Sequence, residues 1–230
     1  MQPDVRKVPA WDLPTRLFHW TLVVLIIMAP ITNKLGVFFW HKLNGYLILT
    51  LILYRLLWGI VGGTTARFSN FVRPFAAFGY GFDLLRGKAR HFLGHNPLGG
   101  MMVLLLLFVV GAQAVLGLMT LDDIPPTVEG PFASKVAEST AELASSWHRR
   151  GFGIILACVA LHVAAIVFYR VMKKENLVRP MITGLKDAGT YEDAQAATYG
   201  SLARAALCFV IAFAIVFGGI KLFGSNGAFM

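Results

Sequence analysis

Residues 147–172 read WHRRGFGIILACVALHVAAIVFYRVM, an apolar run that carries two histidines, His148 and His162. A membrane-spanning helix needs about 20 mostly apolar residues, and this run is long enough. His162 follows His148 by 14 residues, which is about 21 Å along a helix axis and a return to within about 40° of the same face. The stretch therefore predicts a transmembrane helix that presents two imidazoles on one side, at two depths.

Four more apolar blocks accompany this run, and together they predict the fold class. The whole chain of 230 residues is 57% hydrophobic and 14% charged, with a mean hydropathy of +0.65. A soluble domain is usually about a quarter charged. We therefore expect an all-α integral membrane protein with five spans, at about 15–34, 37–63, 97–120, 147–172 and 202–224.

The net charge of +9 does not indicate nucleic-acid binding, because the basic residues sort by the side of the membrane. One side would hold Arg6, Lys7, Arg16, Arg67, Arg73, Arg86, Lys88, Arg90, Arg170, Lys173, Lys174, Arg179, Lys186 and Arg204. The other would hold only Lys34, Lys42, Lys135, Arg149, Arg150 and Lys221. The positive-inside rule places the richer side in the cytoplasm. We predict a multi-pass membrane protein with five spans, a cytoplasmic N-terminus and a C-terminus on the outer side.

The segments between the spans give weaker signals. Residues 68–92 mix aromatic side chains with sparse charge, which fits either a helix in the membrane interface or an ordinary ordered loop. Residues 134–146 could form a short surface helix before the fourth span. The loop 121–146 is acidic, which suits either a basic partner or plain solvation. We expect the first span to be retained, since no small-residue cleavage site follows Thr32.

Four of the six histidines lie within apolar blocks, where an imidazole is costly unless it is bonded. His19 begins the first span on the inner side, and His41 begins the second span on the outer side. Depth then matches His19 with His162 in an inner pair and His41 with His148 in an outer pair. Two imidazoles fill both axial positions of a haem iron, so we predict two b-type haems between facing helices.

A bare metal site is the alternative for these histidines. Zinc or non-haem iron would favour three or four ligands at one depth, often including a carboxylate. The predicted spans contain no Asp or Glu, and the histidines come in twos. Cys158 and Cys208 belong to no CxxC or CxxCH motif, so neither a thiolate site nor covalently attached haem is indicated.

Other residues fit a haem site, each with an ordinary alternative. Gly45 follows His41 by one turn and would let a flat porphyrin approach, or would serve helix–helix contact. Arg55 could meet a propionate of the inner haem or extend to the interface, and Arg149 could do the same for the outer haem. His91 and His95 precede the third span; we expect solvated loop histidines, with a quinone pocket as the alternative for His95.

Several motifs together resemble the prokaryotic cytochrome b-561 family, which includes the cytochrome b subunits of nickel–iron hydrogenases. They are WDLPTRLFHW at 11–20, HKLNG at 41–45, YRLLWG at 54–59, LGHNPLGG at 93–100 and the two histidines of 147–172. The resemblance covers roughly residues 10–185. It implies a bacterial inner (plasma) membrane, so that the outer side, with the C-terminus, is the periplasm. It implies a four-helix core with two b haems, and the family's ligand positions fall on His19, His41, His148 and His162.

The resemblance divides the chain into an N-terminal cytoplasmic segment (1–14), a four-helix dihaem core (15–185), and a linker with a fifth span (186–230). The fifth span goes beyond the small cytochromes' four-helix plan, and it could dock a partner or close one edge of the bundle. The family also implies quinone, as ubiquinone or menaquinone, at one end of the electron path. A c-type cytochrome or a hydrogenase-like protein on the outer face would be the other partner.

The expected function is therefore electron transfer across the bilayer between quinone and a redox protein. An electron-transfer subunit is preferred here to a stand-alone enzyme. The alternative is a self-contained quinone-linked oxidoreductase, such as a superoxide oxidase. A channel or structural membrane protein without haem forms a third class, which a colourless purified protein would favour.

Overall fold

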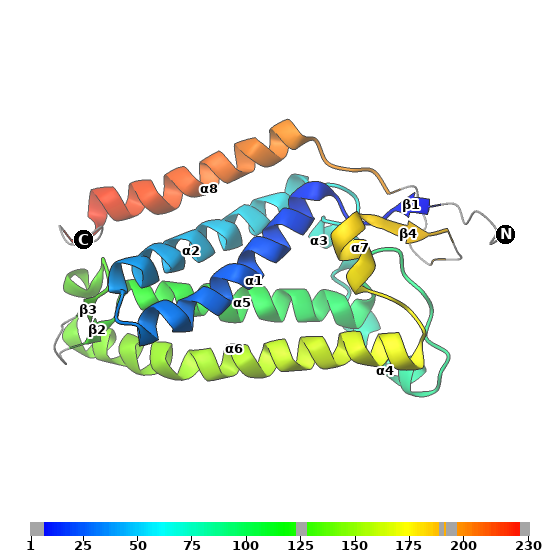
Figure 1. Cartoon of the computed structure of the whole chain (residues 1–230), viewed down its shortest axis with the longest axis horizontal. Coiled ribbons are helices and arrows are strands. Elements are labelled where there is room, and N and C mark those ends of the chain that lie inside the picture. Colours follow the sequence, from blue (N-terminus) through cyan, green and yellow to red (C-terminus); the bar gives the residue numbers. More distant parts are fainter. Residues whose placement is uncertain (1–6, 123–127, 189–190, 192–196, 226–230) are drawn as a thin grey trace. The chain divides into compact units, whose positions relative to one another are not determined.

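The five predicted spans are confirmed as long helices. The computed structural model describes residues 7–122, 128–188, 191 and 197–225. Five of its helices are long and apolar enough to cross a membrane. They are α1 (Leu13–Lys34), α2 (Phe38–Val61), α5 (Pro97–Leu118), α6 (Glu138–Met172) and α8 (Leu202–Phe223) (Figure 1). The chain is thus a helical membrane protein.

Short elements precede the first long helix and occupy the connections between the long helices. The helical ones are α3 (Phe68–Phe71), α4 (Pro74–Leu85), the 3-10 turn η1 (Ala133–Lys135) and α7 (Val178–Thr183). The strands are β1 (Lys7–Pro9), β2 (Leu121–Asp122), β3 (Val128–Glu129) and β4 (Leu185–Asp187). They form two antiparallel pairs, β1 with β4 and β2 with β3. Of the acidic loop, Asp123 lies outside the described residues.

The fourth span is longer than the sequence predicts. Its helix begins at Glu138 instead of near Trp147, so the expected separate surface helix at 134–146 is wrong. Neither proline nor glycine occurs between Glu138 and Arg150, and Ala, Leu and Glu there favour helix. Nothing therefore interrupts the hydrogen-bond ladder before the apolar stretch begins.

Helix α4 favours the interfacial alternative for residues 68–92. Pro74 starts it, and its apolar side chains divide between two faces. Ala77 and Tyr80 are buried, whereas Phe75 is 92% exposed and Phe78 is 77% exposed. An amphipathic helix with large exposed aromatic side chains is typical of an element that lies in the membrane interface.

Contacts divide the chain into two compact units, and each long helix contributes to both. The first unit comprises the described parts of Met1–Phe18, Arg55–Leu105 and Ala160–Ala206. The second comprises the described parts of His19–Tyr54, Leu106–Val159 and Leu207–Met230.

The first unit is held at its edge by the β1–β4 ribbon, in which Lys7 is opposite Asp187 (Figure 1). Gly184 ends α7 with φ +82°, a left-handed conformation that favours glycine. Its carbonyl accepts hydrogen bonds from the backbone N–H groups of Ala10 (2.9 Å) and Trp11 (3.1 Å). Ala10 and Trp11 then pack against Leu93 to form a small apolar core.

The second unit joins its helices through apolar packing and side-chain hydrogen bonds. Tyr46 of α2 packs with Val216 and Ile220 of α8, so in this unit the fifth helix buries part of its surface against the second. Asn44 of α2 donates through Nδ2 to the carbonyl of Leu25 in α1, at 2.9 Å. A buried amide in an apolar setting must be bonded in this way, and the bond fixes α2 against α1.

Asn96 caps α5 and also connects it to α6. Its Oδ1 accepts from the backbone N–H of Gly99 at 2.8 Å, and Pro97 follows as the first helical residue. Its Nδ2 donates to the hydroxyl of Tyr169 at 2.9 Å, and that hydroxyl shares a 2.8 Å hydrogen bond with Tyr80. Burial raises the pKa of Tyr80, so its hydroxyl remains a neutral member of the network.

Replacing Asn96 should test this double role. Asn96→Ala removes the cap and the bond to Tyr169, and we expect a loss of about 1 kcal/mol, or about 2–4 °C in melting temperature. Asn96→Asp keeps the capping oxygen and should lose less than half of that. Thermal unfolding in detergent measures both. Equal melting temperatures for the alanine variant and the wild type would show that Asn96 does not stabilise the start of α5.

Candidate functional site

Two of the four predicted histidines lie together in the second unit. His41 comes from the first turn of α2, and His148 comes from α6. Their ring centroids are 6.2 Å apart, and the ring planes are nearly perpendicular, at 85°. Two side chains separated by more than a hundred residues thus present imidazoles to the same small volume.

Each of these rings is oriented by a backbone carbonyl. His41 Nδ1 lies 2.9 Å from the carbonyl oxygen of Ala29, and His148 Nδ1 lies 2.9 Å from that of Gln113. A carbonyl can only accept, so in both residues Nδ1 carries the proton and donates it. The neutral ring then has its lone pair on Nε2, which is the arrangement found in metal-binding histidines.

Gln113 secures His148 by two hydrogen bonds. Besides accepting at its carbonyl, it donates through Nε2 to the carbonyl of His148 at 2.8 Å. Gln113 of α5 thus makes helix–helix hydrogen bonds to α6 in both directions. Together the two bonds fix both the height of α6 against α5 and the rotation of the His148 ring.

Gly117 leaves the space in which the His148 ring lies. A Cβ atom at this position would be 2.9 Å from Cε1 and 3.3 Å from Nδ1 of His148. Only glycine therefore lets α5 pass so close to the imidazole. Sequence reasoning missed Gly117, because a glycine in an apolar helix equally indicates helix–helix packing.

Gly45 and Arg149 border the two histidines along their own helices. No heavy atom lies within 4 Å of the position that a Cβ would take at Gly45, so open space lies beside α2 one turn after His41. A flat ring system could lie against the helix there. Arg149 directly follows His148 and is exposed, so its guanidinium can meet an anionic group at the margin of the site.

The donor set suits a haem iron held between two imidazoles. With metal–nitrogen bonds of about 2 Å each, two imidazoles on opposite sides of one metal have ring centres roughly 6 Å apart. The observed 6.2 Å separation agrees with that requirement. The Nδ1 hydrogen bonds also leave the nitrogen that would bind the metal as the acceptor on each ring. His41 and His148 therefore fit a haem as its ligands.

The other two predicted ligands lie in different units. His19 belongs to the second unit, where its ring contacts Trp20 edge-on at 4.9 Å. His162 belongs to the first unit and is half-buried in α6. Their pairing stays a prediction. Arg55, also in the first unit, is only 2% exposed, and its guanidinium carbon lies 4.8 Å from the centre of the Phe68 ring.

The two loop histidines differ from each other. His91 is exposed, as expected, and its Nδ1 lies 3.3 Å from a carboxylate oxygen of Glu175. His95 is packed between two aromatic rings, with centroid distances of 4.6 Å to Trp11 and 4.4 Å to Phe71. The expectation of a solvated loop histidine is therefore wrong for His95, because Trp11 and Phe71 come from distant segments whose approach no local pattern reveals.

Comparison with known proteins agrees with this arrangement. The sequence model of the prokaryotic cytochrome b561 family matches residues 10–184. A relative in Azotobacter vinelandii, named "Probable Ni/Fe-hydrogenase B-type cytochrome subunit", is 24% identical over 224 residues, which cover 80% of this chain and 91% of the relative. A protein of the same name in Azotobacter chroococcum mcd 1 is also 24% identical, over 222 residues with the same coverage.

The long match extends over the four histidines and the first four long helices. Members of the matched family are membrane b-type cytochromes of electron transfer, with haem b as their cofactor. The chain therefore belongs to the prokaryotic cytochrome b561 family.

Proposed function

We propose that this protein carries electrons across the bilayer through two haems. His41 and His148 would hold the outer haem, and His19 and His162 the inner one. The observation that supports the proposal is the outer pair, in which two rings 6.2 Å apart each donate Nδ1–H to a carbonyl. A haem b held by these histidines would supply reversible one-electron redox chemistry, which suits electron transfer.

The surrounding residues have separate tasks in this proposal. Gln113 and Ala29 keep both imidazoles in the tautomer that can bind iron, through the carbonyls that accept from Nδ1. Gly45 leaves room for the flat ring system. Arg149, exposed beside His148, would bind a propionate of the outer haem, and the buried Arg55 a propionate of the inner one.

The electron path would end at two partners. We propose that quinone, ubiquinone or menaquinone, exchanges electrons at one end, and that a redox protein does so at the outer face. The two Azotobacter relatives bear names of hydrogenase cytochrome subunits, so a hydrogenase-like partner is as suitable as a c-type cytochrome. The orientation that follows from charge would place His41 and His148 near the periplasm and make the N-terminus cytoplasmic.

Removing one ligand should remove one haem. We expect His148→Ala and His41→Ala each to halve the haem content of the purified protein, because each empties the same site and spares the other. The pyridine haemochrome assay measures haem per chain. His91→Ala is the matched control and should keep the full content, since His91 pairs with Glu175 outside the spans.

The double variant of His41 and His148 sharpens this test. If both histidines serve one haem, it should contain the same half content as either single variant. A further loss in the double variant would show that the two residues serve different haems and would overturn the pairing.

We expect a substitution of Gly117 to weaken binding of the outer haem more than substitution of another glycine of α5. Gly117→Ala places a methyl group 2.9 Å from His148 Cε1, and overpacking of about 1–3 kcal/mol should weaken haem binding roughly tenfold. Gly111→Ala is the control on the same helix, because its Cβ would meet Ile52 at an acceptable 3.4 Å. Haem titration of the apoprotein compares the two, and equal affinities would contradict the role of Gly117.

Electron flow can be measured directly in vesicles. Reduced quinone should produce the absorbance of reduced b haem in the reconstituted wild type, and a soluble c-type cytochrome added outside should then be reduced. We expect His148→Ala to slow this second transfer by at least tenfold, since the path would lack its outer haem. Transfer at the wild-type rate in His148→Ala would refute the proposed route.

A further inference from the structure

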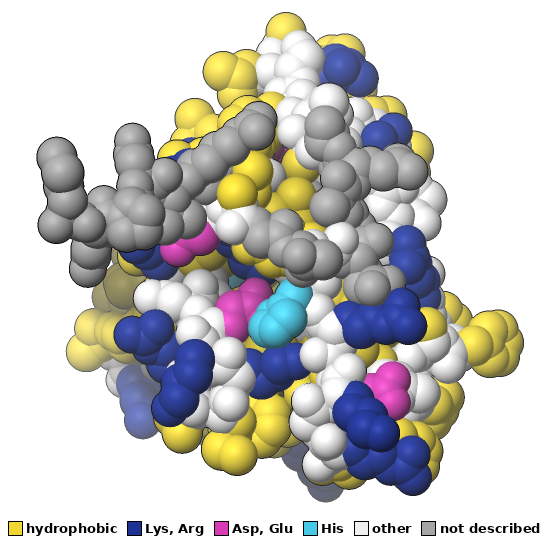
Figure 2. Space-filling model, turned by 90° about the vertical axis from the view of Figure 1, so that its right-hand side faces the viewer, with side chains coloured by type: hydrophobic (Ala, Val, Ile, Leu, Met, Phe, Trp, Pro, Cys, Tyr) yellow, Lys and Arg dark blue, Asp and Glu magenta, His cyan; other side chains and the backbone are white. Residues whose placement is uncertain are grey.

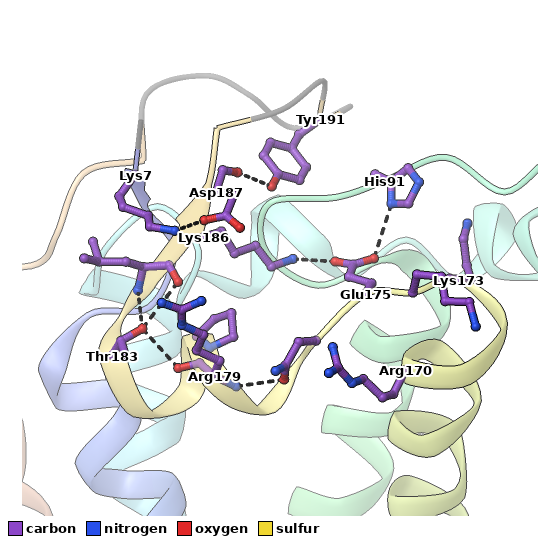
Figure 3. A pocket seen from close by; sticks show the side chains of 14 residues that line it. Lys7, His91, Arg170, Lys173, Glu175, Arg179, Thr183, Lys186, Asp187 and Tyr191 are labelled. Atoms are coloured by element: carbon purple, nitrogen blue, oxygen red, sulfur yellow. Dashed lines mark hydrogen bonds and ion pairs between the residues drawn. The ribbon is translucent and has the colours of Figure 1, made fainter. Parts of the chain in front are cut away.

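A basic pocket of about 620 Å³ lies in the first unit, where α6 ends and α7 and β4 follow (Figure 3). Its lining comes from three separate parts of the chain: β1, the loop before α5, and residues 170–191. Six of the lining residues are basic: Lys7, Arg170, Lys173, Lys174, Arg179 and Lys186. Dark blue Lys and Arg side chains also gather on the face seen in Figure 2, beside yellow hydrophobic ones.

The two carboxylates of the pocket already have lysine partners. Lys186 lies 2.8 Å from a carboxylate oxygen of Glu175, with His91 on the other oxygen (Figure 3). Lys7 donates to Asp187, and this hydrogen bond holds the pKa of Asp187 below its ordinary value. The other four basic residues, Arg170, Lys173, Lys174 and Arg179, therefore carry positive charge that these two carboxylates do not balance.

Among the described residues, most of this excess charge is not held in an ion pair. Lys173 donates to the carbonyl of Ala89 at 2.6 Å, which does not neutralise it. Within the described part of the chain, Arg170 and Lys174 make no ion pair. Like charges held close together repel unless an anion lies among them. The pocket thus has the electrostatics of an anion site.

Lys174 occupies a position that normally favours glycine. It follows the end of α6 with φ +55°, the left-handed conformation of a helix C-terminus. The backbone N–H of Glu175 accordingly bonds back to the carbonyl of Tyr169 at 3.1 Å. Such positions usually carry glycine, and another residue there costs about 1 kcal/mol or more. A lysine here adds positive charge to the pocket at the expense of backbone stability.

Exposed apolar side chains lie on the same elements that form the pocket. Met172 is the last residue of the α6 span, and Val178 and Ile182 are one turn apart on α7; all three are exposed. Leu185 lines the pocket and is also exposed. A basic cluster at the end of a membrane span, with exposed apolar side chains on the same elements, has the features of a site for both a phosphate and an acyl chain.

We propose that this pocket binds the phosphate of an anionic phospholipid. The lipid's acyl chains would lie along the exposed apolar side chains of α6 and α7. Free phosphate and an acidic protein segment are also anions, but neither has acyl chains that could contact the exposed apolar side chains. The inference concerns a site apart from the four histidines and does not depend on how many haems they hold.

Lipid titration of the full-length, haem-loaded protein in mild detergent tests the proposal. Native mass spectrometry should show tighter binding of phosphatidylglycerol than of phosphatidylcholine with the same acyl chains. Lys174→Gly should weaken the phosphatidylglycerol binding about fivefold, as removal of one charge near a membrane surface does. Arg170→Gln should do the same, whereas Lys88→Gln, an exposed lysine outside the pocket, should have no effect.

Lys174→Gly also separates binding from folding. Because glycine relieves the left-handed backbone, this variant should melt at a higher temperature than the wild type while it binds the lipid more weakly. Unchanged lipid affinity in this variant would overturn the proposal. Equal affinities for phosphatidylglycerol and phosphatidylcholine would also overturn it. The same holds if inorganic phosphate or polyglutamate, at a concentration equal to that of the lipid, fully displaces it.

Discussion

An imidazole among apolar helices must use both of its ring nitrogens, and the second unit is organised around this requirement. At His41 and His148 one nitrogen is committed to a backbone carbonyl of a neighbouring helix, Ala29 or Gln113. Carbonyls inside a helix already accept the helical bond and still have a second lone pair, so they can orient a side chain without disrupting the helix. The other nitrogen of each ring, Nε2, is then left to bind the group that the two histidines hold.

This constraint makes several other residues necessary. A ring held at a fixed angle requires that the neighbouring helix leave room for it, which Gly117 does. It also requires fixed helix heights. Gln113 fixes α5 against α6, and Asn44 fixes α2 against α1. The packing of α8 on Tyr46 adds apolar support to α2.

The first unit follows a different physical principle. Apart from Arg55 and His162, which lie within α2 and α6, the polar groups discussed in this unit lie near the ends of the spans. Charged and amide groups there can meet water or lipid headgroups. Lysines and arginines gather between α6, α7 and β4, and two of the lysines pair with Glu175 and Asp187. The network of Tyr80, Tyr169 and Asn96 joins α4, α5 and α6 at this end.

Local sequence determined the spans, their order and the position of each histidine along its helix. Hydropathy is a property of a short window, and 14 residues along a helix fix both the rise and the rotation between His148 and His162. Motifs such as HKLNG and LGHNPLGG carried the family resemblance. The extent of α6 was underestimated because no breaker marks its true start, and the surroundings of His95 could not be seen from its own neighbours.

Only the tertiary structure decided which carbonyl meets which imidazole, that Gly117 faces His148, and that Lys7, His91 and residues 170–191 share one pocket. Each of these depends on how far one helix is rotated and shifted against another. Helix rotation is set by many weak contacts between residues far apart in the sequence. Periodicity shows which residues share a face of one helix, but not which face of the next helix they meet.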